Sequence, residues 1–168
     1  AYIAWENLKP EVREKVFKIL NSAPEDSDLN TGYDQYNSRS TATKQRELFM
    51  FAAIWSDVIR DRKFDVRYKK YHQGDWHYAD IFWKQENNKA VILENFPEES
   101  GKAIYKLSDF EKILRSSSHS DEEKAIALAW FLHVGGDIHQ PLHNASRVTD
   151  TEKKGDQGGN LFKFMPPT

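Results

Sequence analysis

The stretch of sequence that decides the fold runs from Ser120 to His143 and reads SDEEKAIALAWFLHVGGDIHQPLH. It begins with Ser120-Asp121-Glu122-Glu123, a capping-box pattern that opens helices, and continues with apolar residues at helical spacing. We therefore predict a helix from Glu122 to about His139. Pro141 ends this helix, because the residue before a proline is disfavoured in helical geometry.

The same segment carries candidate metal ligands. His133 and Asp137 are four residues apart, so their side chains project from one helix face about one turn apart and can share a cation. Taken alone, the two residues are explained equally well by a helix-surface ion pair. His143 lies beyond Pro141 and can turn back over the same pocket. His139 faces elsewhere, and we interpret it as a structural histidine that hydrogen-bonds the backbone near the helix end.

The rest of the chain also has helical periodicity, and we find neither an internal repeat nor a β-sheet signature. The sequence therefore predicts a mainly α fold with one domain over residues 1–168. Further helices are expected after Pro10 and ending before Ala23-Pro24, from about Thr43 through the apolar positions up to Ile59, and from about Gly101 to Arg115. Loops are expected from Glu25 to Thr41 and from Asn144 to Gly159, with a turn at Asn87-Asn88.

Composition restricts the classes of function. The 24 Lys and Arg residues face 26 Asp and Glu residues, so the net charge of −2 gives no overall basic surface for a nucleic-acid backbone. There is no Cys, so thiolates neither bind metal nor attack a substrate here. Apolar runs stay shorter than the roughly 20 residues that a membrane-spanning helix needs. We expect a monomer without a membrane span.

Two other segments supply groups that match the first pair. Asp57 and Arg60 are three residues apart on a predicted helix, and they combine a metal-binding carboxylate with a phosphate-binding guanidinium. An ordinary surface salt bridge is the alternative. His77 lies in an aromatic setting with Asp80 nearby as an acceptor or substrate contact. A packed, hydrogen-bonded histidine is the alternative for His77.

Four motifs in this order closely resemble the trinuclear-zinc single-strand-specific nucleases, whose superfamily includes the bacterial zinc phospholipases C. The motifs are Trp-Ser-Asp-x-Ile-Arg from Trp55, His-Tyr-x-Asp from His77, Leu-His-x-x-Gly-Asp-Ile-His-Gln-Pro-Leu-His from Leu132, and Gly-Asp-x-Gly-Gly-Asn from Gly155. The likeness covers nearly the whole chain. It implies a mostly helical enzyme that cleaves single-stranded DNA and RNA and removes 3′-phosphates.

Carried over position by position, the resemblance implies a set of metal ligands. Asp57, His77, His133 and Asp137 would bind a first zinc ion, with Asp137 also bridging to another zinc. His143 would bind the second of three zinc ions.

The resemblance also implies a set of substrate contacts. Arg60 matches the phosphate-contacting arginine of the family and joins Asp57 as a candidate catalytic residue. Tyr78, Asp80 and Asn160 fall at or near positions that receive the base and phosphate.

The sequence departs from the family at both ends. Members begin, after export, with a ligand tryptophan followed closely by a ligand histidine, and they carry a further histidine and aspartate near the other end. Relative to these members the sequence from Ala1 to Thr168 lacks those segments, so we expect a domain trimmed at both ends with one complete zinc site. The resemblance implies export to the periplasm or the exterior.

Zinc would bring positive charge to a slightly acidic protein at the point where a phosphodiester sits. The sequence thus favours a zinc-dependent endonuclease that leaves 5′-phosphate products and has 3′-nucleotidase activity. Two alternatives stay open. One is a zinc phospholipase C or phosphomonoesterase with the same metals, and the other is an inactive, metal-poor helical fragment.

Overall fold

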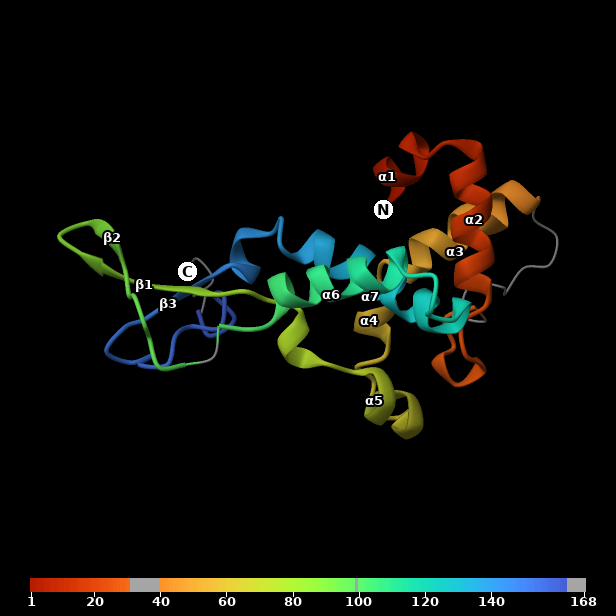
Figure 1. Cartoon of the computed structure of the whole chain (residues 1–168). Helices are drawn as coiled ribbons and strands as arrows, with labels where there is room; N and C mark the ends of the chain where they lie inside the picture. Colours follow the sequence, from red (N-terminus) through yellow and green to blue (C-terminus); the bar gives the residue numbers. More distant parts are fainter. Residues whose placement is uncertain (31–39, 99, 163–168) are drawn as a thin grey trace, which may run out of the picture.

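The computed structural model describes residues 1–30, 40–98 and 100–162, and its architecture is mainly α as predicted (Figure 1). The helices are α1 (Tyr2–Asn7), α2 (Pro10–Asn21), α3 (Thr41–Ala52), α4 (Trp55–Val58), α5 (Asp65–Tyr71), α6 (Ala103–Arg115) and α7 (Asp121–Asp137). Three short 3-10 turns join them: η1 (Glu25–Ser27), η2 (Gly74–Trp76) and η3 (Pro141–His143). The strands are β1 (Ile81–Glu86), β2 (Lys89–Ile92) and β3 (Ala145–Arg147).

Helix α7 lies at the centre of the helical body, where it contacts α2, α3, α4 and α6 (Figure 1). Ser120 accepts a hydrogen bond from the backbone of Glu123, and the Glu123 carboxylate accepts one from the backbone of Ser120, so the predicted capping box is confirmed. Its buried residues cover more than half of its circumference, and partly buried apolar residues occupy much of the remainder, as expected for a helix that packs against several others. The side chains of α7 are therefore held in place by packing on several sides.

An aromatic cluster joins α7 to the segments that reach the candidate site. Trp55 on α4 meets Trp130 on α7 edge-on at 6.3 Å between ring centroids, and Trp76 meets Trp130 at 4.9 Å. The indole N–H of Trp55 donates to the carbonyl of Ser27 at 2.8 Å, so this fully buried ring has its polar atom satisfied. The cluster fixes α4 and η2 on the surface of α7.

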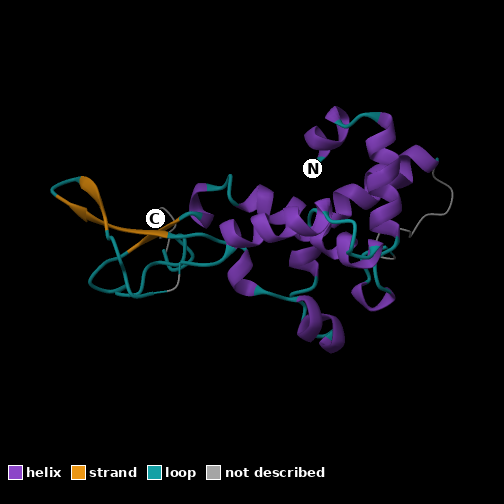
Figure 2. Cartoon of the chain, viewed as in Figure 1, coloured by secondary structure: helices purple, strands orange, loops and turns teal. Residues whose placement is uncertain are grey.

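A small β-sheet is present that was not predicted from the sequence. A three-stranded sheet forms with the order β2-β1-β3, in which β1 pairs antiparallel with β2 and parallel with β3. The predicted turn at Asn87-Asn88 is confirmed and connects β1 to β2, with φ of 48° and 62° at the two asparagines. The sheet extends away from the helical body (Figure 2). The sheet was not predicted because its strands are largely exposed and so lack a regular alternation of apolar and polar residues.

The other boundaries agree with the sequence in part. The helices predicted after Pro10 and from about Gly101 to Arg115 are confirmed as α2 and α6. The helix predicted from Glu122 to about His139 is confirmed as α7, which ends at Asp137, whereas α1 was not predicted. The helix expected from Thr43 to Ile59 is interrupted, because α3 ends at Ala52 and α4 starts at Trp55. Strand β3 lies inside the loop expected from Asn144 to Gly159, and residues 31–39 of the other expected loop lie outside the described part.

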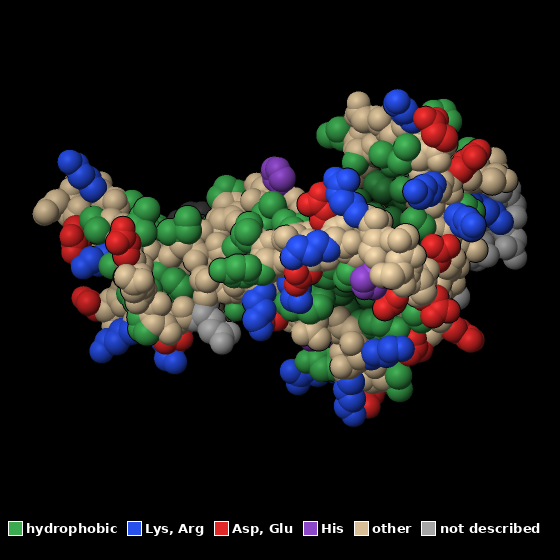
Figure 3. Space-filling model, in the orientation of Figure 1, with side chains coloured by type: hydrophobic (Ala, Val, Ile, Leu, Met, Phe, Trp, Pro, Cys, Tyr) green, Lys and Arg blue, Asp and Glu red, His purple; other side chains and the backbone are tan. Residues whose placement is uncertain are grey.

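The molecule is elongated, with the helical body at one end and the sheet at the other (Figures 1 and 2). Charged side chains of both signs are spread over the visible face, and Lys and Arg gather over α5 at its lower edge (Figure 3). Within the described residues, no helix has the length and apolar character that a membrane crossing requires.

Candidate metal centre and active site

Helix α7 presents two of the predicted ligands from one face. His133 Nε2 lies 3.1 Å from Asp137 Oδ2, and the exposed fractions of the two side chains are only 8% and 14%. The i,i+4 spacing on a helix explains this proximity. Because the pair is buried, it differs from the exposed ion pair that was its alternative interpretation.

The two ring nitrogens of His133 have different partners. Nδ1 lies 2.8 Å from the carbonyl oxygen of Ala53, which can only accept, so Nδ1 carries the hydrogen in the neutral ring. Ala53 sits in the interruption between α3 and α4, where the backbone N–H of Asp57 bonds to Ile54 and leaves the Ala53 carbonyl available. The helix break thus turns the lone pair of His133 Nε2 towards Asp57 and Asp137.

His77 enters the same point from the end of η2. Its Nδ1 lies 3.0 Å from His133 Nε2 and 3.1 Å from Asp137 Oδ2. The ring packs edge-on against Trp130 at 5.3 Å and is buried, and its Nε2 has no hydrogen-bond partner in the described part of the chain. Packing, more than hydrogen bonding, therefore orients His77.

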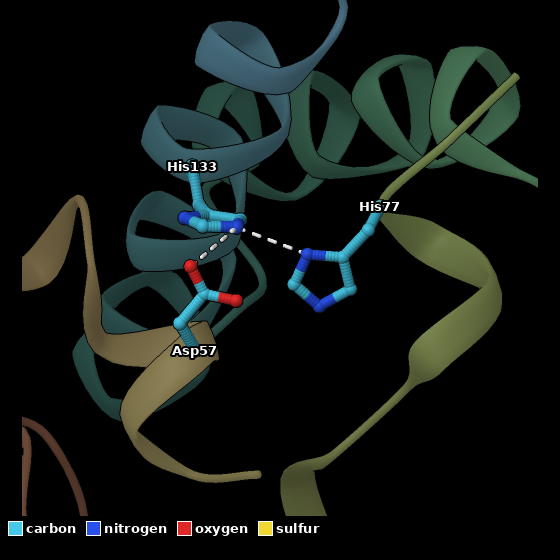
Figure 4. Close-up of side chains that lie close together, drawn as sticks. All are labelled: Asp57, His77 and His133. Carbon is cyan, nitrogen blue, oxygen red and sulfur yellow. Dashed lines mark hydrogen bonds and ion pairs between the residues drawn. The ribbon is translucent and has the colours of Figure 1, made fainter. Parts of the chain in front are cut away.

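Asp57 approaches from α4, with Oδ2 3.8 Å from His133 Nε2. Asp57, His77 and His133 each place one ligand atom within 4.8 Å of the other two, and their side chains point towards one another (Figure 4). Asp137 adds the carboxylate oxygen that contacts both histidines. The structure thus brings together all four residues that the sequence assigned to the first zinc, from three separate segments.

The chemistry of this donor set fits zinc. Two imidazole nitrogens and two carboxylates are ligands that zinc accepts, and the Ala53 carbonyl provides the outer hydrogen bond that orients a ligating histidine. Burial raises the pKa of Asp137, but hydrogen bonds from His133 and His77 outweigh burial and lower it overall. The Asp137 carboxylate is therefore charged and available to a cation at neutral pH.

A pocket of about 760 Å³ adjoins this cluster and joins the helical body to the sheet end. Besides His77, its lining contains all five other residues that the sequence assigned to substrate or to a second metal: Arg60, Tyr78, Asp80, His143 and Asn160. The predicted ligand His143 is thus beside the pocket and outside the group formed by Asp57, His77 and His133. The carbonyl oxygen of His143 accepts a hydrogen bond from the backbone N–H of Ala79 at 2.9 Å.

Among the described residues, the Arg60 guanidinium makes one long contact, with Asp57. Its Nη1 lies 3.4 Å from Asp57 Oδ1 on the adjacent turn, and 63% of its side chain is exposed. An exposed i,i+3 pair of this length is weak. The guanidinium therefore sits at the mouth of the pocket, within one helical turn of the Asp57 carboxylate.

Asp80 lies deeper in the pocket wall. Burial raises its pKa, the neighbouring Asp156 raises it further, and His143 opposes both effects. Its Oδ1 is buried and meets no hydrogen-bond partner within the described ranges. Tyr78 beside it is fixed by a close approach of Gly101, where a Cβ atom would lie 2.2 Å from the Tyr78 carbonyl oxygen.

The interpretation of His139 as a structural histidine is confirmed. Its Nδ1 lies 2.7 Å from the carbonyl of Gly135, one turn earlier in the helix, and the residue is exposed away from the cluster. Sequence reasoning missed His72, which lines the pocket beside Arg60. No motif contains His72. Its position five residues before His77 is the one feature of the sequence that could have placed it near the site.

Comparison with known proteins bears on this arrangement. A family model described as S1/P1 nuclease matches residues 1–166. Comparisons with the curated proteins and with the solved structures gave no significant match.

Proposed function

The chain belongs to the S1/P1 nuclease family, and we propose that it acts as a zinc-dependent endonuclease on single-stranded DNA and RNA. Membership of this family makes the protein a nuclease in general terms. The proposal adds the metal, the preference for single strands, 5′-phosphate products and 3′-nucleotidase activity. We also propose that the protein is exported and works as a monomer.

The observation that carries the proposal is the convergence of two buried histidines and two carboxylates beside a pocket that is lined by Arg60. Asp57, His77, His133 and Asp137 would hold one zinc ion. Asp137 and His143 would contribute to the second and third ions of the family arrangement. Bound zinc supplies a Lewis acid and a source of hydroxide near pH 7, because it lowers the pKa of water to about 7.

The residues of the chain would position the phosphodiester for attack by water. Arg60 would donate to the non-bridging oxygens, where negative charge increases as the water oxygen bonds to phosphorus. The bond from phosphorus to the 3′-oxygen then breaks, the 3′-oxygen takes up a proton, and a 5′-phosphate results. Asp57 would act as a catalytic residue by holding both the metal and the Arg60 guanidinium.

Preference for single strands follows from the pocket. Asp80, whose Oδ1 has no hydrogen-bond partner among the described residues, would offer a hydrogen bond to the edge of a base, while Tyr78 and Asn160 line the same cavity. A base inside a duplex reaches such a pocket only after unstacking, which costs a few kcal/mol. An unpaired base avoids most of that cost.

Two other functions use the same groups. A phospholipase C or phosphomonoesterase would place a different leaving group in the pocket, and an inactive helical domain would hold little or no metal. The aromatic ring of Tyr78 and the carboxyl group of Asp80 in the pocket lining favour a nucleotide, because a base can stack on the ring and hydrogen-bond to the carboxyl group.

Zinc analysis followed by parallel assays separates these possibilities. We expect the zinc-loaded protein to cleave single-stranded DNA to 5′-phosphate ends and to act more slowly on duplex DNA and on phosphatidylcholine. A chelator should abolish cleavage and added zinc should restore it. Hydrolysis of phosphatidylcholine alone would replace the nuclease proposal with the phospholipase, and zinc binding without any hydrolysis would support an inactive domain.

A further inference from the structure

The segment from Arg60 to Lys70 is strongly basic although the whole chain is slightly acidic. It contains six Lys and Arg residues and two Asp residues, in a protein whose net charge is −2. The segment connects α4 to α5 and forms most of α5, and Lys and Arg side chains gather over this edge of the molecule (Figure 3). A local basic surface thus lies next to the candidate active site.

Internal ion pairs neutralise only part of this charge. Arg67, Lys69 and Lys70 pair with Asp28, Asp65 and Asp26 at 3.0, 2.7 and 2.6 Å. Arg62, by contrast, is exposed and has no carboxylate within 4.0 Å among residues 1–30, 40–98 and 100–162. The carboxylate of the adjacent Asp61 accepts a hydrogen bond from the backbone N–H of Lys63 at 3.0 Å and makes no ion pair with Arg62 within the described ranges.

An aromatic stack connects Arg62 to His72, which lines the pocket. Its guanidinium carbon lies 5.5 Å from the centre of the Tyr68 ring, and the His72 ring stacks on the same tyrosine at 4.8 Å with an interplanar angle of 22°. Helix α5 carries Tyr68, and His72 follows its last residue. The stack therefore fixes two nitrogen-bearing side chains at the end of one helix.

His72 links this stack to the active site. It lines the same pocket as Arg60 and His77, and its Nδ1 is buried without a hydrogen-bond partner in the described part of the chain. Burial lowers the pKa of His72, and the nearby charges of His77, Arg60 and Arg62 lower it further. Arg60 and His72 thus line the pocket, and Arg62 lies on the tyrosine ring on which His72 stacks.

We propose that Arg62 and His72, held by Tyr68, form a second phosphate subsite that binds the phosphodiester next to the one being cleaved. This inference rests on the proposed nuclease function, because the ligand is the continuing single strand. The planar guanidinium offers paired N–H donors to phosphate oxygens, and an imidazole N–H adds another donor. An exposed cation such as Arg62 can bind the next phosphate of a strand that is longer than one nucleotide.

Binding of oligothymidylate to the metal-free protein, measured by fluorescence anisotropy at several salt concentrations, tests the subsite without hydrolysis. We expect Arg62→Gln to weaken binding of an oligonucleotide of about eight residues by about three- to tenfold. The slope of log affinity against log salt should fall by about 0.7, the value for one phosphate contact on a single strand. Binding of a 3′-mononucleotide, which has no second phosphodiester, should stay unchanged.

Two further variants make the test specific. Arg115→Gln removes an exposed arginine from the end of α6, and it should leave oligonucleotide binding unchanged. His72→Phe keeps a ring on Tyr68 but removes both nitrogens, and it should weaken oligonucleotide binding in the same direction as Arg62→Gln. Thermal melting of each variant confirms that the fold is retained.

The results separate this inference from the proposed function. Unchanged binding by Arg62→Gln, or equal loss for the mononucleotide and the oligonucleotide, would overturn the second subsite. Loss in Arg115→Gln of the same size would also overturn it, because charge alone would then explain the effect. The nuclease proposal fails on a different measurement, namely absence of single-strand cleavage by the zinc-loaded protein.

Discussion

At the scale of single residues, the two ring nitrogens of His133 have different partners in the candidate metal centre. Nδ1 is committed to the Ala53 carbonyl at 2.8 Å, and Nε2 faces His77, Asp57 and Asp137. His139 is six residues further along the chain, yet its Nδ1 serves only the backbone of Gly135. Two histidines of one segment therefore offer a matched comparison.

His133→Asn should lower the affinity for zinc by at least tenfold, because it removes a ligand nitrogen from the cluster. His139→Asn should leave the zinc affinity within about twofold of the original, since its Nδ1 bonds to the Gly135 carbonyl and the residue lies outside the group formed by Asp57, His77 and His133. Competition with a fluorescent zinc chelator measures both affinities. A larger loss in His139→Asn than in His133→Asn would reverse the assignment of the ligands.

Arg60→Lys should reduce kcat on single-stranded DNA by about tenfold or more while zinc content stays the same. Lysine keeps the charge but loses the planar pair of donors that a phosphoryl group needs. Stability should change little, because the side chain is 63% exposed and its contact with Asp57 is long. Steady-state kinetics and zinc analysis check this, and full activity of the lysine variant would exclude a specific guanidinium role.

The sequence could predict part of this site at the residue scale. The pairing of His133 with Asp137 follows from helical spacing alone. The approach of His77 and Asp57 does not, because it depends on how η2 and α4 dock against Trp130, and the family resemblance supplied it instead. The Ala53 carbonyl and His72 carried no sequence signal, since a backbone group and an isolated histidine form no motif.

At the scale of elements, interruptions in regular structure position the chemistry. The apolar stripe from Thr43 to Ile59 predicts one continuous helix, but tertiary packing ends α3 at Ala52 and frees the carbonyl that His133 uses. The strands β1 and β2 gave no periodic signal because neither face is well covered. Hydrophobic periodicity thus predicted the helices that bury one face. It did not predict the exposed strands β1 and β2 or the interruption between α3 and α4.

Helix α7 carries a pH dependence that differs between the zinc-free and zinc-bound protein. Burial disfavours the charged form of His133, but its hydrogen bonds to Asp137 and to the Ala53 carbonyl outweigh burial and raise its pKa above the ordinary 6.5. The stabilisation from protonated His133 is therefore complete below pH 6.5 and is lost as pH rises through the raised pKa. The lowered pKa of Asp137 stabilises the folded protein at neutral pH. This contribution is lost only in acid, as the pH falls below about 4.

We expect the melting temperature of the zinc-free protein to fall as the pH rises from 6.5 to about 8. The increase in melting temperature on adding zinc should grow over the same interval, because protons and zinc compete for His133 Nε2. Differential scanning fluorimetry with chelator or zinc measures both trends. In His133→Asn the fall in the zinc-free protein should become smaller, and an undiminished fall would assign it to other groups.

At the scale of the whole molecule, the helical body and the sheet end have separate tasks. The helical body supplies the residues of the candidate zinc cluster, whereas Asp80, His143 and Asn160 belong to the connections at the sheet end. The pocket of about 760 Å³ exists only where these parts meet. Substitutions at the sheet end should therefore separate substrate binding from binding of the first zinc.

Gly158 provides that separation. It has φ of +65°, and a Cβ atom would lie 2.0 Å from the carbonyl oxygen of Leu142, next to His143. Because backbone cannot give way cheaply, Gly158→Ala should displace the loop that carries Asn160 from η3. The zinc cluster does not depend on this contact, since its residues are fixed by α4, η2 and α7.

We expect Gly158→Ala to lower kcat/KM on oligonucleotides by about tenfold or more and to leave the affinity of the first zinc within about twofold. Gly135→Ala is the matched control, because it adds the same methyl group within α7, where no described atom other than the adjoining backbone of the helix and the two neighbouring residues lies within 4 Å. That change should be neutral, or stabilise the fold by up to about 1 kcal/mol, without loss of activity. If Gly158→Ala also releases the first zinc, the sheet end must support the metal centre directly, and the two parts of the molecule would form one functional unit.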